Sequence, residues 1–161
     1  MWRMNALPPG PHIVGTNLDQ PRKLLTNMIT AILVASVTWF VVAASLFFNP
    51  IVDGVYRRQE GEPAVRALPK SPTTIGKILL AIVIQCVLWA VVYRWVAPAL
   101  PDGTTSKVLT FGSIIVFMKM VPRDIDRMLL TTYPNGRMII EFLIGCICAY
   151  VVSYAFVYFL S

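Results

Sequence analysis

The stretch that decides the fold is residues 24–48, LLTNMITAILVASVTWFVVAASLFF, which contains no charged side chain. A bilayer has a hydrocarbon core about 30 Å thick and a helix rises about 1.5 Å per residue, so about 20 apolar residues cross it. Two further apolar runs follow, at residues 78–97 and 138–160. The three runs predict an all-α integral membrane protein whose helices cross the bilayer.

The composition predicts the same class of protein. Of the 161 residues, 57% are hydrophobic and only 14% are charged, whereas soluble domains are about a quarter charged. The net charge of +6 comes from Lys and Arg residues that flank the apolar runs, where such residues set topology and contact lipid headgroups. We therefore expect membrane lipids as partners and no nucleic acid. We also expect no cofactor and no metal, because the only histidine, His12, lies in the N-terminal tail.

The chain divides into a tail and one membrane domain. Prolines at positions 8, 9 and 11 predict an irregular tail over residues 1–20. Residues 21–161 are expected to form a domain of four transmembrane helices, at about 24–48, 74–97, 108–122 and 137–160. In the polar connection after the first helix, residues 50–60 fit a short surface helix, and the prolines that follow argue against a long one.

The third transmembrane segment has the shortest apolar run, residues 108–118, which is followed by Lys119 and Pro122. A run of this length can cross the membrane, re-enter it or lie buried among other helices. We expect a short crossing that ends near Pro122, followed by an amphipathic segment over residues 123–130 on the cytoplasmic face. A re-entrant hairpin is the alternative.

The basic residues predict an orientation. With four crossings, the connections after the first and third helices share one side of the membrane, which holds eight basic residues: Arg57, Arg58, Arg66, Lys70, Lys77, Arg123, Arg127 and Arg137. The other side holds four, Arg3, Arg22, Lys23 and Lys107, with Arg94 near that boundary. The positive-inside tendency therefore places both termini outside, although Arg22 and Lys23, directly before the first helix, favour the reverse. The size and layout resemble those of small bacterial four-helix membrane proteins, which implies a bacterial inner or plasma membrane.

Two ionisable residues lie inside the apolar segments. Glu141 is one turn into the fourth helix, and Lys119 is about one turn before the end of the third. Charged residues within membrane helices are costly and are therefore candidates for a functional site with a partner. Because these two helix ends meet at the same membrane surface, we expect Lys119 and Glu141 to form an ion pair. The alternative is that each side chain reaches the interface separately.

Small and polar residues predict contacts between helices. On the fourth helix, small side chains recur every four residues, at Gly145, Ala149 and Ser153. Such a stripe lets two membrane helices approach closely, so it predicts a contact within the chain or with a partner. Gln85 is the strongly polar side chain deep in the second helix, and we expect it to hydrogen-bond to another helix.

The end of the second helix has the composition of a membrane boundary. Aromatic rings with a polar edge favour the level of the headgroups, and arginine reaches outward from the same depth. The anchors predicted on this basis are Trp89, Tyr93, Arg94 and Trp95.

These features predict a small membrane protein without an evident catalytic site. We expect an accessory or self-associating subunit, part of a homo-oligomer or of a larger membrane complex, and a non-enzymatic role is favoured over an enzymatic one. A small transporter or channel that uses Lys119 and Glu141 is the first alternative. The second is a lipid-modifying enzyme at the membrane boundary, built on Arg57, Arg123, Asp124 and Asp126.

Overall fold

A computed structural model describes residues 19–59, 61–62 and 71–161, and the regular elements of these residues are all helices, without a strand. The all-α prediction is therefore confirmed for this part of the chain. Residues 1–18 of the predicted tail lie outside the described residues, while residues 19 and 20 already belong to the first helix. The elements in chain order are α1 Asp19–Phe47, α2 Pro50–Arg58, α3 Pro72–Val96, the 3₁₀ turn η1 Ala97–Ala99, α4 Thr104–Ile115, the π-helical turn η2 Val116–Met120, α5 Val121–Leu130 and α6 Asn135–Leu160.

Three of the described segments are long and apolar enough to cross a membrane: Gln20–Phe47, Pro72–Ala99 and Asn135–Leu160. They correspond to α1, to α3 with η1, and to α6. Large apolar side chains remain uncovered on each of them, including Leu33 at 56% exposed, Leu80 at 61% and Leu143 at 56%. An apolar surface of this extent is typical of contact with lipid or with another protein.

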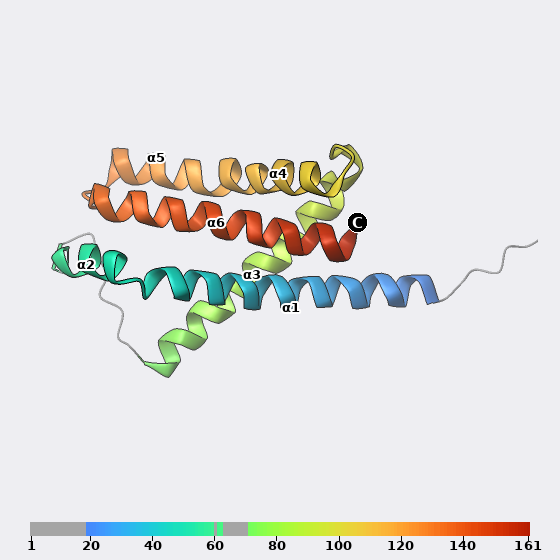
Figure 1. Cartoon of the computed structure of the whole chain (residues 1–161), viewed down its shortest axis with the longest axis horizontal. Helices are drawn as coiled ribbons and strands as arrows, with labels where there is room; N and C mark the ends of the chain where they lie inside the picture. The colour runs from blue at the N-terminus through green and yellow to red at the C-terminus, as the bar shows by residue number, and fades with distance from the viewer. Residues whose placement is uncertain (1–18, 60, 63–70) are drawn as a thin grey trace, which may run out of the picture.

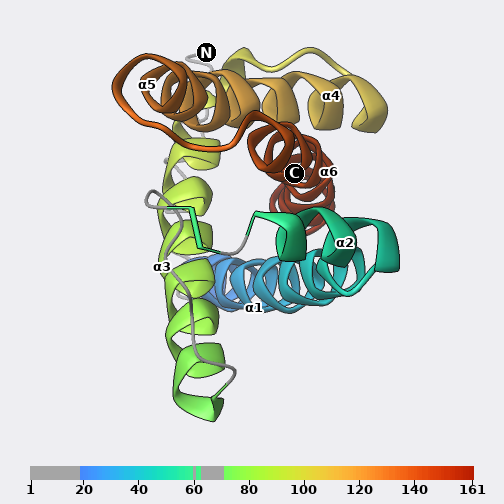
Figure 2. The same cartoon turned by 90° about the vertical axis from the view of Figure 1, so that its left-hand side faces the viewer.

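The long helices alternate in direction. In Figure 1, α1 and the rod formed by α4 and α5 run from right to left, whereas α3 and α6 run from left to right. Figure 2 shows α6 between α1 and the α4–α5 rod, with α3 crossing at the side. Helix α6 contacts both α1 and α4 extensively, and α3 packs chiefly on α1. Helix α2 therefore lies at the same end of the molecule as α5 and the start of α6; we call this the basic end.

Two short sequence signals begin α2 and α3. The Asn49 side chain accepts a hydrogen bond from the backbone N–H of Ile51, and Pro50 begins α2. Ser71 caps the next helix by accepting from the backbone N–H of Thr74, and Pro72 follows it. Both are favoured helix starts, because the cap satisfies a free N–H and proline at the first position needs no acceptor. Helix α2 thus occupies most of the segment predicted as a surface helix.

The third segment differs from the prediction, because the helix does not end near Pro122. Helix α4, the π turn η2 and α5 form one rod from Thr104 to Leu130 (Figure 1). The backbone N–H of Val121 donates to the carbonyl of Val116, five residues earlier. This wider turn changes the hydrogen-bond register just before Pro122, which has no N–H to donate, so the helix continues past the proline. No reversal that would make a re-entrant hairpin occurs within residues 104–130.

The core lies among α1, α3, α4 and α6, and its large buried rings come from the last three. Tyr93, Phe111 and Phe156 are fully or almost fully buried, and the ring of Phe111 meets that of Tyr93 edge to face, with centroids 5.0 Å apart. Close approach of α4 to α6 depends on Gly112, since a Cβ there would overlap the ring of Tyr150. The fold is therefore set by aromatic packing together with small residues at helix crossings.

Candidate functional site

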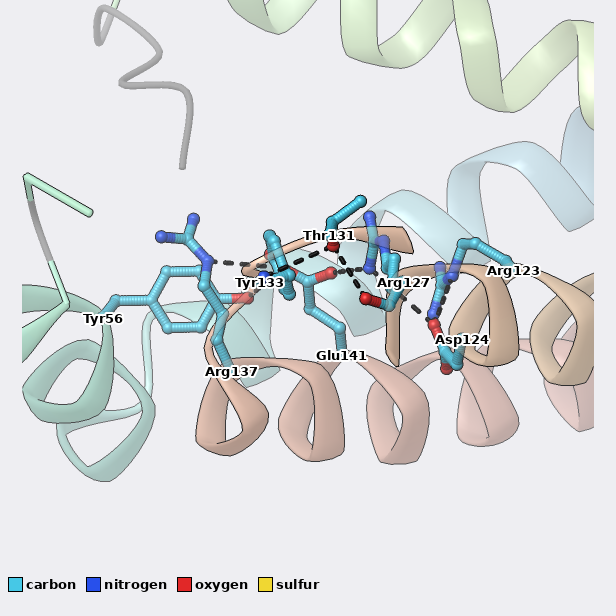
Figure 3. A network of polar contacts seen from close by, with 8 residues as sticks. All are labelled: Tyr56, Arg123, Asp124, Arg127, Thr131, Tyr133, Arg137 and Glu141. Atoms are coloured by element: carbon cyan, nitrogen blue, oxygen red, sulfur yellow. Dashed lines mark hydrogen bonds and ion pairs between the residues drawn. The ribbon is translucent and has the colours of Figure 1, made fainter. Parts of the chain in front are cut away.

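The polar residues of the basic end converge on Glu141, in the second turn of α6. Figure 3 shows side chains from α2, α5, α6 and the α5–α6 connection lying in one line along the start of α6. The Glu141 carboxylate accepts from Arg127 Nη1 at 2.6 Å and from Arg137 Nε at 3.3 Å. It also accepts from the hydroxyls of Tyr56, at 3.1 Å, and Tyr133.

This arrangement makes Glu141 a junction between elements that are distant in sequence. Tyr56 is supplied by α2, Arg127 by α5 and Tyr133 by the connection to α6, and four donors surround one carboxylate. Charge-assisted hydrogen bonds of this kind are roughly twice as strong as neutral ones. Glu141 is therefore placed to fix α2 and α5 against α6.

The aromatic partners of Glu141 also stack on its arginines. The guanidinium of Arg137 lies 3.9 Å from the ring centroid of Tyr56, and that of Arg127 lies 4.6 Å from that of Tyr133. Burial, together with the hydrogen bond to Glu141, raises the pKa of Tyr133 to about 12. Burial and the nearby carboxylate likewise raise the pKa of Tyr56 above its ordinary value. Both phenols therefore act as hydrogen-bond donors over the whole physiological pH range.

A second carboxylate lies along the same line, at Asp124 on α5. Arg123 binds it through two hydrogen bonds, Nε to Oδ1 at 2.7 Å and Nη2 to Oδ2 at 3.1 Å. Arg127 Nη1 lies 3.8 Å from the same Oδ1 atom. Asp124 is therefore buried within an arginine pair, which leaves it poorly placed to bind a metal. In the described part of the chain, no group of three His, Cys, Asp or Glu residues could hold a metal ion.

Lys119, in the π turn η2, lies deeper in the bundle and has neutral partners. Its ammonium donates to the side-chain carbonyl of Gln85 on α3, and it lies 4.1 Å from the ring centroid of Trp39 on α1. Gln85 thus makes the predicted contact with another helical segment, and its partner there is Lys119. Lysine over a tryptophan ring is a favourable cation–π pair.

The expected ion pair between Lys119 and Glu141 is not formed in the structure. Glu141 pairs with Arg127 and Arg137, which lie nearer on α5 and α6, and Lys119 turns toward α3 and α1. The two residues nevertheless line one cavity of about 160 Å³, bounded by α1, η2, α5 and α6. Trp39 and Arg123 line the same cavity.

The small-residue stripe of α6 is used inside the chain. Ala149 and Ser153 are buried, and the Ser153 hydroxyl donates to the carbonyl of Val108 on α4 at 2.8 Å. A Cβ on Gly145 would overlap the end of the Met120 side chain. Of the two alternatives that the sequence left open, the structure therefore shows the contact within the chain.

The predicted boundary residues occupy different environments. Trp95 is 81% exposed and Arg94 is also exposed, whereas Trp89 packs partly against the core. Tyr93 departs from the prediction, because its ring is buried against Phe111 and its hydroxyl pairs with that of Ser161 at 2.6 Å. A tyrosine at a helix end can serve the core instead of the interface when another helix covers its ring.

The residues proposed for lipid modification do not gather into one site. Arg57 pairs with Asp53 within α2 at 2.8 Å, and Asp126 is exposed on α5. Of that set, only Arg123 and Asp124 contact each other directly. The sequence did not single out Tyr56, Arg127 or Tyr133; the four-residue spacing of Arg137 and Glu141 was a signal for that pair.

Comparisons with known proteins do not identify this chain further, since no family model, no curated protein and no solved structure matches it.

Proposed function

We propose that this chain is an integral membrane protein of four crossings that acts as a non-catalytic accessory or self-associating subunit. The observation that carries the membrane assignment is the uncovered apolar surface of α1, α3 and α6. The α4–α5 rod is the fourth crossing, because it lies beside α6 in the opposite direction and its three segments of 12, 5 and 10 residues exceed the length needed to span about 30 Å.

The orientation follows from the two ends of the bundle. Six described basic residues belong to the basic end: Arg57, Arg58, Lys77, Arg123, Arg127 and Arg137. Arg22, Lys23, Arg94 and Lys107 belong to the opposite end. The excess supports a cytoplasmic basic end with the termini outside, in a bacterial inner or plasma membrane.

A subunit role is supported by how the polar residues are used. Glu141 and Asp124 are engaged by arginines of this chain, and the pair of Arg127 with Glu141 joins α5 to α6. Because α6 uses its small residues within the chain, self-association needs a different surface. Helix α3 leaves the largest share of its apolar span uncovered, so we expect a second copy of this chain to pack there.

Cysteine cross-linking in mild detergent tests this role. Leu88 on α3 and Val37 on α1 are almost equally exposed, at 59% and 58%, so Leu88→Cys and Val37→Cys form a matched pair. We expect a disulfide-linked dimer with Leu88→Cys and none with Val37→Cys. Equal cross-linking at both positions would indicate random collision, and a monomer without any cross-link would contradict self-association.

A small transporter or channel is the second candidate, favoured by the cavity that Lys119 and Glu141 share. Reconstituted liposomes test it through the flux of protons and small ions. Lys119→Met should abolish a flux that passes through this cavity, whereas Lys107→Met, at the opposite end of the α4–α5 rod, should leave it unchanged.

A further inference from the structure

The charges around the cavity beside Lys119 do not balance. The charged residues that line it are two cations, Lys119 and Arg123, and one carboxylate, Glu141. The ion pairs of the lining residues add Asp124, Arg127 and Arg137, so that two carboxylates are set against four cations. Partly buried charges of one sign repel one another and attract an anion. The excess of positive charge therefore calls for a negative group that the described residues do not supply.

The two carboxylates are already engaged. Glu141 accepts from two arginines and two tyrosines, and Asp124 is bound by Arg123 through both oxygens. Lys119, by contrast, contacts the neutral side chains of Gln85 and Trp39. Of these four cations, Lys119 is thus the one that forms no ion pair with a carboxylate of the described residues.

The cavity has the size and lining to admit such a group. Its volume of about 160 Å³ is several times the roughly 30 Å³ that one water molecule occupies. Lys119 and Arg123 line it together with Trp39, Phe47 and Glu141. Arg123 uses Nε and Nη2 for Asp124, so its remaining guanidinium donors are available to a ligand.

We propose that this cavity binds one phosphate group, held by Lys119 and Arg123. A phosphate offers several strong acceptor oxygens and negative charge, which lysine meets as a compact charge and arginine as a planar fork of donors. The group belongs either to the headgroup of an anionic phospholipid or to free inorganic phosphate. This site goes beyond the proposed subunit role, because it binds its ligand whether or not the chain associates with another copy.

The experiment uses the purified full chain in phosphate-free detergent, with two arms. In the first, phosphatidylglycerol is added and bound lipid is counted by native mass spectrometry. In the second, inorganic phosphate is titrated by calorimetry without lipid. Each arm compares the wild type with Lys119→Gln, Arg123→Gln and Lys119→Arg, and with Arg58→Gln, which removes an exposed arginine of the same end outside the cavity.

We expect Lys119→Gln and Arg123→Gln to weaken binding about tenfold or more, the loss typical of one charge-assisted hydrogen bond. Lys119→Arg should retain most of the affinity, and Arg58→Gln should bind like the wild type. Dependence on Lys119 and Arg123 in the first arm alone identifies the lipid as the source, and the same dependence in the second arm identifies free phosphate.

The proposal is overturned if neither probe binds the wild type, or if Arg123→Gln binds as tightly as Arg58→Gln in both arms. Helix content by circular dichroism is measured for every variant. Should Lys119→Gln lose its helix content, the comparison of Arg123→Gln with Arg58→Gln decides the outcome, because both arginines lie toward the surface of the basic end. Cross-linking through Leu88→Cys is measured separately, so failure of the subunit role leaves this result interpretable.

Discussion

At the basic end, helices α2, α5 and α6 are joined through the carboxylate of Glu141, whereas in the middle of the bundle α4 and α6 touch through Gly112, Tyr150 and Ser153. In the first region the helices are held together by ion pairs and hydrogen bonds, and in the second by close packing of side chains. Lys119 lies between them and belongs to neither, since its partners are an amide and an indole. We infer that the charges which join helices are paired with one another, whereas the charge left with neutral partners marks the proposed ligand site.

The largest effect is expected from removing the charge of Glu141. Glu141→Gln leaves Arg137 without its carboxylate and Arg127 with only the more distant Asp124. Breaking a largely buried ion pair costs about 3 kcal/mol or more. Unfolding in mixed micelles measures the loss, and Asp126→Asn, at an exposed carboxylate of α5, serves as the control with a change within about 0.5 kcal/mol. Equal stability of the two variants would show that Glu141 does not hold the basic end together.

The close packing of α4 against α6 is tested with Gly112→Ala. The new Cβ would overlap the Tyr150 ring, which is held between helices, so we expect a loss of about 1–3 kcal/mol from overpacking. Gly76→Ala is the matched change on α3, where nothing lies near the new Cβ, and it should stabilise the helix by about 0.5–1 kcal/mol. If both substitutions stabilised the protein, α4 and α6 would not approach as closely as described.

A double-mutant cycle sharpens the distinction between Lys119 and the arginines. Combining Arg127→Gln with Glu141→Gln should reveal a coupling energy of about 1–3 kcal/mol, because the two side chains touch. Combining Lys119→Met with Glu141→Gln should give a coupling below about 0.5 kcal/mol, the additive result for groups that share no direct contact. A large coupling energy in the second cycle would show that Lys119 and Glu141 interact directly, as expected from the sequence.

The smallest effect is a pH dependence at the basic end. An unfolded tyrosine ionises near pH 10, and the pKa of Tyr133 is raised to about 12, so folding favours the protonated phenol. The resulting stabilisation is complete below about pH 10 and declines as the pH rises toward 12. Unfolding measured across this interval should show the decline in the wild type and a smaller one in Tyr133→Phe.

Much of the helical architecture could be predicted from the sequence. The apolar runs located α1, α3 and α6, and the surface helix expected over residues 50–60 corresponds to α2. The continuation of the helix past Pro122 could not be predicted in the same way. A proline ends a helix unless the hydrogen-bond register changes before it, and nothing local to residues 116–120 distinguishes a π turn from a helix end.

The candidate site was predicted in part. Glu141, Lys119 and Gln85 were recognised as costly polar groups in apolar helices, but their partners were not. Tyr56 reaches Glu141 from a helix 85 positions earlier, a relation that depends on how α2 folds back over α6. Whether Lys119 pairs with Glu141 or with Gln85 depends on how three helices are rotated relative to one another. Hydrophobic patterning does not define these rotations.

The proposed topology of four crossings requires that residues 104–130 span the whole membrane. Labelling of single cysteines in sealed vesicles with a membrane-impermeant reagent tests it most directly, in a background where Cys86, Cys146 and Cys148 are replaced by alanine. We expect Arg58→Cys and Thr132→Cys to react from one side and Asp102→Cys from the other. Reaction of all three from the same side would contradict it.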